Sequence, residues 1–187
     1  EQSYRMGLTP FPDVATNTWY YGGMLTAAEK GYMTKGMPAE NALAQDALLM
    51  VLRAAGVENI TGDCALQAPG VSKVSPYAIC AVNAAHKNGL ALQRDMTGPV
   101  ERIRIAEWIS TLKPDLPKQT DGAVDTVSFV DIQSLGDAKR FVAYMYVNGI
   151  MVGRTSADGK KRYFDPALPL TRAALAVMLE KLLHPAP

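Results

Sequence analysis

The chain has 187 residues, of which 48% are hydrophobic and 20% are charged. The 19 basic and 18 acidic residues leave a formal net charge of +1, which argues against a protein that binds nucleic acid through a basic excess. No run of eighteen apolar residues occurs, so no membrane insertion is expected, and the first ten residues lack the pattern of a signal peptide. A soluble globular chain, either mature or a fragment, is predicted.

The first predicted helix lies within residues 11–31, FPDVATNTWYYGGMLTAAEKG, and is expected to end at Gly31. A glycine suits the position after a helix because it adopts the left-handed conformation at no steric cost. The same pattern returns without a gap at residues 129–149, FVDIQSLGDAKRFVAYMYVNG, and more weakly at residues 76–89, PYAICAVNAAHKNG. Three short helices, each followed by a glycine, are therefore predicted.

A second kind of helix follows each of the first kind. Its three copies align without gaps and occupy residues 42–55, 99–112 and 169–182. Apolar residues recur at i, i+3, i+4 and i+7 in each copy, which indicates one buried helical stripe. Arg102 falls on Arg172 in this alignment, and Gln45 stands at the corresponding position of the first copy. Thr171 is predicted to be the N-cap of the last helix.

The loop between the two helices of the third unit is lengthened by an insertion at residues 153–164, GRTSADGKKRYF. Its Asp158-Gly159 pair is a strong hairpin turn signal, so a small β-hairpin is expected there. Residues 112–125 are rich in proline and polar residues and are predicted to be a linker. The predicted fold class is all-α, with three helix-loop-helix units at residues 9–57, 65–115 and 126–184. The second unit is degenerate.

Cys64 and Cys80 are too few for a disulfide framework and lack the spacing of a zinc site. They are expected to be two buried thiols or, in an exported chain, one disulfide, and the sequence leaves both open. His86 and His184 belong to no metal or catalytic pattern, so no cofactor or metal is expected. No nucleotide-binding, hydrolase or metalloprotease motif occurs, which argues against an enzyme, although two well-spaced carboxylates would suffice for a glycosidase.

These motifs resemble the S-layer homology repeat. The likeness lies in the pattern F-x-D-V, a helix that begins near a tryptophan, a glycine, an F-x-P approach and T-R-A-E at the start of an apolar helix. It is closest at residues 11–19 (FPDV…W) and 129–179 (FVDI…G…FDPALPLTRAALAVML). The resemblance implies three helix-loop-helix repeats in a pseudo-threefold arrangement, forming one compact module.

The resemblance also implies a function. Such modules are non-catalytic parts of larger exported proteins of the bacterial cell surface. They anchor these proteins to the cell wall by binding a secondary cell-wall polysaccharide, often pyruvylated and peptidoglycan-linked, in grooves between repeats. The alternative reading is that degenerate repeats serve protein docking or the internal structure of a larger surface protein. No unit keeps the complete capping box, so one or two competent grooves are expected.

The expected ligand-binding residues are Asp13, Trp19, Arg102, Asp131, Arg154, Thr171 and Arg172. An arginine beside a helix N-terminus could hold a carboxylate together with the first-turn N–H groups, and the site at Arg172 is expected to be the strongest. The inserted loop would add positive charge to it. From the residues alone, Trp19 could equally cover the core. Asp13 and Asp131 are expected first of all to cap the turns that follow them.

Overall fold

The structure is a computed structural model that describes residues 11–114 and 128–184. Within these residues lie six α-helices: α1 (Tyr21–Glu29), α2 (Ala44–Ala55), α3 (Ile79–Lys87), α4 (Arg102–Leu112), α5 (Lys139–Val147) and α6 (Arg172–Leu183). Two 3-10 helices, η2 (Pro76–Ala78) and η3 (Gln133–Ala138), lead into α3 and α5. None of the helices in these two ranges is long and apolar enough to cross a bilayer. The prediction of a mainly helical chain is confirmed.

Some of the predicted features fall outside this part of the chain. Most of the predicted linker at residues 112–125 is not described, and neither are the outermost residues of the predicted units, 9–10, 115 and 126–127. We call the described remainders the first segment (residues 11–57), the second segment (65–114) and the third segment (128–184).

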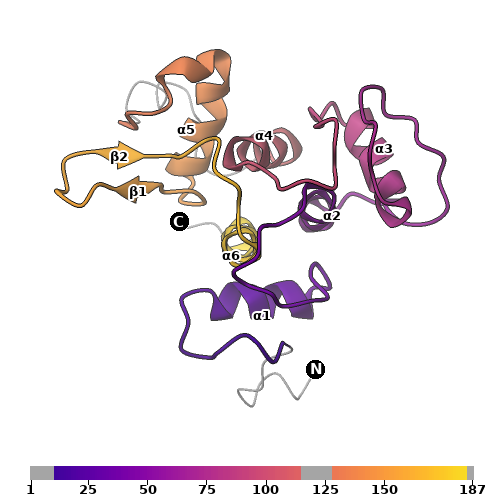
Figure 1. Cartoon of the computed structure of the whole chain (residues 1–187), viewed down its shortest axis with the longest axis horizontal. Coiled ribbons are helices and arrows are strands. Elements are labelled where there is room, and N and C mark those ends of the chain that lie inside the picture. Colours follow the sequence, from indigo (N-terminus) through magenta and orange to yellow (C-terminus); the bar gives the residue numbers. More distant parts are fainter. Residues whose placement is uncertain (1–10, 115–127, 185–187) are drawn as a thin grey trace.

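The helices form an inner and an outer set (Figure 1). The inner helices α2, α4 and α6 are seen end-on around the centre, and α1, α3 and α5 lie outside them on three sides. Each outer helix packs against an inner helix from another segment: α1 against α6, α3 against α2 and α5 against α4. The buried apolar side chains of all three segments therefore form one continuous core.

A glycine follows each outer helix, as the sequence predicts. Gly31, Gly89 and Gly149 have left-handed φ values of 68°, 74° and 69°. In each case the residue after the glycine donates its N–H back to a carbonyl in the last turn of the helix, which satisfies a group that the helix end leaves unpaired. The three predicted helix ends are confirmed.

A closed ring of three backbone hydrogen bonds joins the entries of the inner helices. The N–H of Ala42 donates to the carbonyl of Leu170, that of Leu170 to Val100, and that of Val100 back to Ala42, with N···O distances of 2.8–3.0 Å. Each of these residues directly precedes the N-cap residue of its inner helix. Because every member both donates and accepts, the position of each helix entry depends on the other two.

The ring corrects the alignment of the first segment. Arg102 and Arg172 are the first residues of α4 and α6, and the first residue of α2 is Ala44. The prediction that Gln45 stands at the arginine position is therefore wrong by one residue. All residues from 47 to 52 are buried, so this apolar run fits two helical registers equally well. Periodicity could not choose between the registers, whereas the backbone pairing does.

The insertion and the cysteines both form local links. Strands β1 (Arg154–Thr155) and β2 (Arg162–Tyr163) pair antiparallel, and Gly159 in their turn has a φ of 72°, so the predicted hairpin is confirmed. Cys64 and Cys80 form a disulfide with a Cα–Cα distance of 5.4 Å. Of the two alternatives that the sequence leaves open, the structure has the disulfide.

Candidate functional site

Arg172 holds a turn of the first segment. Its Nε donates to the carbonyl of Gly36 at 2.9 Å and its Nη2 to that of Lys35 at 2.6 Å. From the other side, the carboxylate of Asp13 accepts a hydrogen bond from the N–H of Met37 at 2.5 Å. The turn at residues 35–37 thus lies between a carboxylate of its own segment and an arginine of the third segment. We call this arrangement a loop clamp.

A second loop clamp holds a turn of the third segment. Nε of Arg102 donates to the carbonyl of Phe164 at 2.8 Å, and its guanidinium lies 5.2 Å from the centroid of the Phe164 ring. Asp131 accepts hydrogen bonds from the N–H groups of Phe164 and Asp165 at 2.9 and 2.7 Å. Met37 and Asp165 both have left-handed φ values, 54° and 57°, so the two clamped turns share this backbone feature.

Burial affects the pKa of the arginine in the second loop clamp. Desolvation lowers the pKa of the Arg102 guanidinium, and the nearby carboxylates of Asp165 and Asp131 oppose that shift. The two carboxylates therefore offset part of the cost of burying this charge. The expectation that Asp13 and Asp131 cap the turns directly after them is wrong, because each binds a turn 24 to 34 residues further along the chain.

The corresponding turn of the second segment is held by neither half of a loop clamp. Ala44 occupies the arginine position at the start of α2. Lys73 lies beside the corresponding turn, where its carbonyl accepts from the N–H of Met96 and its Nζ lies 3.2 Å from the carboxylate of Asp95. That carboxylate in turn accepts from the N–H of Thr97 at 2.9 Å, so the turn is stabilised from within. The aspartate and the arginine are thus absent together, as expected for two halves of one structural device.

The first-turn N–H groups of α6 already have acceptors. Those of residues 172–174 donate to the carbonyls of Glu40 and Pro38 and to the hydroxyl of Thr171, at 2.8, 3.1 and 3.2 Å. The prediction that Thr171 is an N-cap is confirmed. The prediction that these N–H groups share a ligand carboxylate with the arginine is wrong, because the neighbouring segment satisfies them first.

Neither Arg154 nor Trp19 is among the described residues that line the pocket at Arg172. Arg154 donates from Nε and Nη2 to the carboxylate of Asp165 at 2.6 and 2.9 Å, which ties the hairpin to the turn that Arg102 holds. The structure therefore joins Arg154 and Arg172 to different turns. Trp19 is 69% exposed and packs edge-on against Tyr20, so the alternative that it covers the core is wrong. A ligand contact at Trp19 or Arg154 stays a prediction.

A groove of about 290 Å³ opens beside Arg172. Its polar and aromatic lining includes Tyr32, Lys35, Asp46, Arg53, Tyr77 and Arg172, which come from all three segments. Three cations face one carboxylate among these residues, so the groove favours an anionic ligand. The hydrogen bonds of Arg172 use Nε and Nη2, and its Nη1 has no protein acceptor in the part of the chain that the structure describes.

Tyr77 forms a fixed part of the groove, although its side chain is exposed. Its hydroxyl accepts from Nε2 of Gln45 at 2.7 Å and donates to the carboxylate of Asp46 at 2.6 Å. Burial of the hydroxyl raises the pKa of Tyr77 to about 12, and the hydrogen bond to Asp46 adds to this rise. The phenol is therefore neutral at physiological pH and acts as a hydrogen-bonding aromatic surface.

Sequence reasoning missed Tyr77, although a signal was present. Tyr77 precedes Gly89 by the same number of residues as Trp19 precedes Gly31. The two aromatic residues thus take corresponding positions ahead of α3 and α1, and both are largely exposed. The gapless repeat alignment places the two residues at the same position, although one is a tyrosine and the other a tryptophan.

Comparison with known proteins adds no assignment to this geometry. No family model matches the chain, and a search of curated proteins finds no match either. Within residues 11–114 and 128–184, no group of three or more histidine, cysteine or carboxylate side chains is placed to hold a metal ion.

Proposed function

We propose that this chain is a three-repeat module of the S-layer homology type, which binds an acidic cell-wall polysaccharide without catalysis. The closed ring at Ala42, Val100 and Leu170 supports three repeats in a pseudo-threefold arrangement. Two further sets of three hydrogen bonds are also cyclic and run in the opposite direction to the ring. They join the N–H groups of residues 44, 102 and 172, and of 45, 103 and 173, to the loop of the next segment. Such cyclic repetition is what three equivalent units around one axis require.

The proposed class of ligand rests on the groove beside Arg172. Arginine and lysine recognise carboxylates through charge-assisted hydrogen bonds, and an aromatic ring offers its face to a sugar. In this groove Lys35, Arg53 and Arg172 supply the charge, and Tyr32 and Tyr77 supply the rings. The loop clamp orients the guanidinium of Arg172 in advance and leaves Nη1 for a ligand. A polysaccharide bearing carboxylates, such as pyruvate ketals, fits this chemistry.

The proposed setting is the surface of a bacterial cell, where the chain would be part of a larger exported protein. The disulfide between Cys64 and Cys80 supports export, because such bonds persist in oxidising compartments.

A docking or structural role is the second candidate. It draws on three exposed aliphatic residues of the third segment, Val130, Val152 and Leu168. Val130 and Val152 lie beside the same residue, since Arg162 accepts through its carbonyl from the N–H of Val130 and donates from Nη2 to the carbonyl of Val152. Exposed apolar side chains close together are a feature of protein contacts.

The test uses two exposed lysines of the first segment as a matched pair. Lys35 lines the groove and Lys30 does not. Lys35→Ala should weaken binding of a pyruvylated wall fragment roughly tenfold, because a hydrogen bond to a charged group contributes about 1.5 kcal/mol. Lys30→Ala should bind as the unmodified chain does. Titration calorimetry measures both, and thermal melts show whether folding is intact.

Arg172→Ala should weaken binding ten- to a hundredfold. It also removes half of a loop clamp, so its effect must be corrected for any loss of folded protein. Sedimentation with purified cell walls, before and after removal of the non-peptidoglycan polymers, tests the ligand class. Equal binding to stripped walls, or equal effects of the two lysine variants, would contradict the proposal. Binding that depends on Val130 and Val152 instead would favour docking.

A further inference from the structure

A second cavity lies in a different part of the molecule from the groove. It has a volume of about 520 Å³ and lies between the chain that follows α2 and one face of α3. Its lining shares no residue with that of the groove. The residues after α2, from Val57 to Gln67, form one wall, and α3 contributes Cys80, Asn83, Ala84 and Lys87 to the other.

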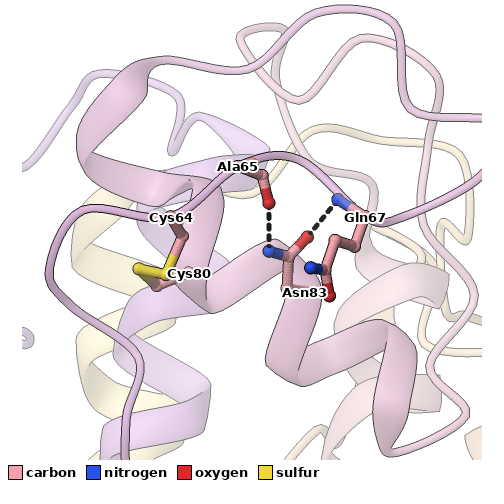
Figure 2. Close-up of a disulfide and its surroundings, with 5 residues drawn as sticks. All are labelled: Cys64, Ala65, Gln67, Cys80 and Asn83. Carbon is pink, nitrogen blue, oxygen red and sulfur yellow. Dashed lines mark hydrogen bonds between the residues drawn. A yellow bond between two sulfur atoms is a disulfide. The ribbon is translucent and has the colours of Figure 1, made fainter.

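The wall after α2 is held in place at three points, two of which Figure 2 shows. The disulfide joins Cys64 to Cys80 of α3. The side chain of Asn83, only 8% exposed, accepts from the N–H of Gln67 and donates to the carbonyl of Ala65, both at 2.8 Å. The third point is Ile60, which is buried in the core. The cavity is therefore preformed, and a preformed site lowers the entropic cost of binding a ligand.

Four polar side chains of the lining are available for a ligand. Glu58, Asn59, Asp63 and Lys87 are exposed, and their side chains make no hydrogen bond or ion pair with the described residues. Two carboxylates face one ammonium group, so the lining carries an excess of negative charge. The side-chain amides of Asn59 and Gln67 add neutral donors and acceptors. Among the described residues, no aromatic side chain lines this cavity.

From this cavity we infer a second binding site, which takes a small ligand with a primary ammonium group flanked by hydrogen-bonding groups. The carboxylates of Glu58 and Asp63 receive the ammonium group, and the amides of Asn59 and Gln67 bind the neighbouring polar groups. The disulfide and Asn83 position this wall and make no polar contact with the ligand. The site is separate from the proposed polysaccharide groove and opposite to it in charge preference.

An NMR titration of the full chain tests the inference with two pairs of probes. Glucosamine is compared with N-acetylglucosamine, and lysine amide with its Nα,Nε-diacetyl derivative, because neither acetylated probe retains an ammonium group. The ammonium probes should cause saturable shifts in residues 57–67 and 80–88, and the acetylated probes should not. The pair that binds more tightly separates an amino sugar from a diamino acid as the source of the ammonium group.

Charge-neutralising variants locate the site. Glu58→Gln combined with Asp63→Asn should weaken ammonium binding at least tenfold, and Lys87→Gln should strengthen it a few fold because a repelling charge is removed. Glu29→Gln, at an exposed carboxylate outside the lining, is the matched control and should have no effect. Equal binding of acetylated probes, absence of saturable shifts, or shifts confined to Arg172 and Tyr77 would each overturn the inference. Unchanged melts show that the variants fold.

Discussion

The loop clamp holds the turns of the first and third segments, whereas the corresponding turn of the second segment is built without it. Ala44 stands at the arginine position, Lys73 lies beside that turn, and the carboxylate of Asp95 stabilises the turn internally. The backbone bonds of the central ring are nevertheless the same in all three places. The ring therefore sets the arrangement of the helices. The side chains that hold the turns around it can differ from one segment to another.

The second segment is fastened by other means. Gln45, only 2% exposed, donates from Nε2 to the hydroxyls of Ser75 and Tyr77 and accepts from the N–H of Ser75. The disulfide adds a covalent link between Cys64 and α3. The segment whose sequence resembles the repeat least is thus held by a buried amide and a covalent bond. The second segment is therefore firmly held, although its turn has no loop clamp.

The largest expected effect on stability is that of Asp131, the aspartate of the second loop clamp. Asp131→Ala removes two hydrogen bonds to a charged acceptor and leaves two N–H groups of a partly buried turn without partners, so the free energy of unfolding should fall by about 4 kcal/mol. Asp13→Ala removes one bond at an exposed site and should cost about 1 kcal/mol. Urea unfolding measures both. Equal losses would show that the two loop clamps do not differ as their contacts indicate.

Removal of the disulfide tests the covalent link of the second segment. Cys64→Ala combined with Cys80→Ala should lower the free energy of unfolding by about 3 kcal/mol, as expected for a loop of this length. A reducing agent should destabilise the unmodified chain by a similar amount and leave the double variant unchanged, which serves as the control. An unfolding midpoint that is insensitive to reduction would contradict this role.

Gln45 tests the buried amide in the same segment. Gln45→Leu should lower the free energy of unfolding by about 2 kcal/mol, because the N–H of Ser75 loses its acceptor in a partly buried position. Ser75→Ala removes the bond that the Ser75 hydroxyl accepts and keeps the acceptor of the Ser75 N–H, so it should cost about half as much. Chemical denaturation distinguishes the two variants. A larger effect of Ser75→Ala would mean that the hydroxyl, and not the amide, holds this junction.

The smallest expected effect is a pH dependence at Tyr77. Its pKa rises from 10.0 to about 12 on folding, chiefly because the hydroxyl is partly buried. The contribution of the neutral phenol to stability is therefore complete below pH 10 and is lost as the pH rises through 12. Tyr77→Phe should have a shallower decline of stability between pH 10 and 12 than the unmodified chain. Parallel denaturation curves across this range would show that Tyr77 contributes no such linkage.

The sequence by itself determined the local features of the chain. The glycines after α1, α3 and α5, the Thr171 cap and the hairpin at Asp158-Gly159 are all signalled by neighbouring residues, and the structure has each of them. Such features depend on backbone conformations that a few adjacent residues favour or forbid, so a local pattern suffices to predict them.

Only the tertiary structure decided how these elements meet. It placed α1 against α6, assigned Ala44 rather than Gln45 to the arginine position, and gave Arg172 carbonyl partners in another segment. The tertiary structure also placed Tyr77 in the lining of the groove. An apolar stripe indicates that a helix is buried, but it does not indicate which element the helix packs against. An arginine indicates a positive charge, but it does not indicate which group will accept its hydrogen bonds. Those choices depend on long-range backbone pairing, which no local periodicity encodes.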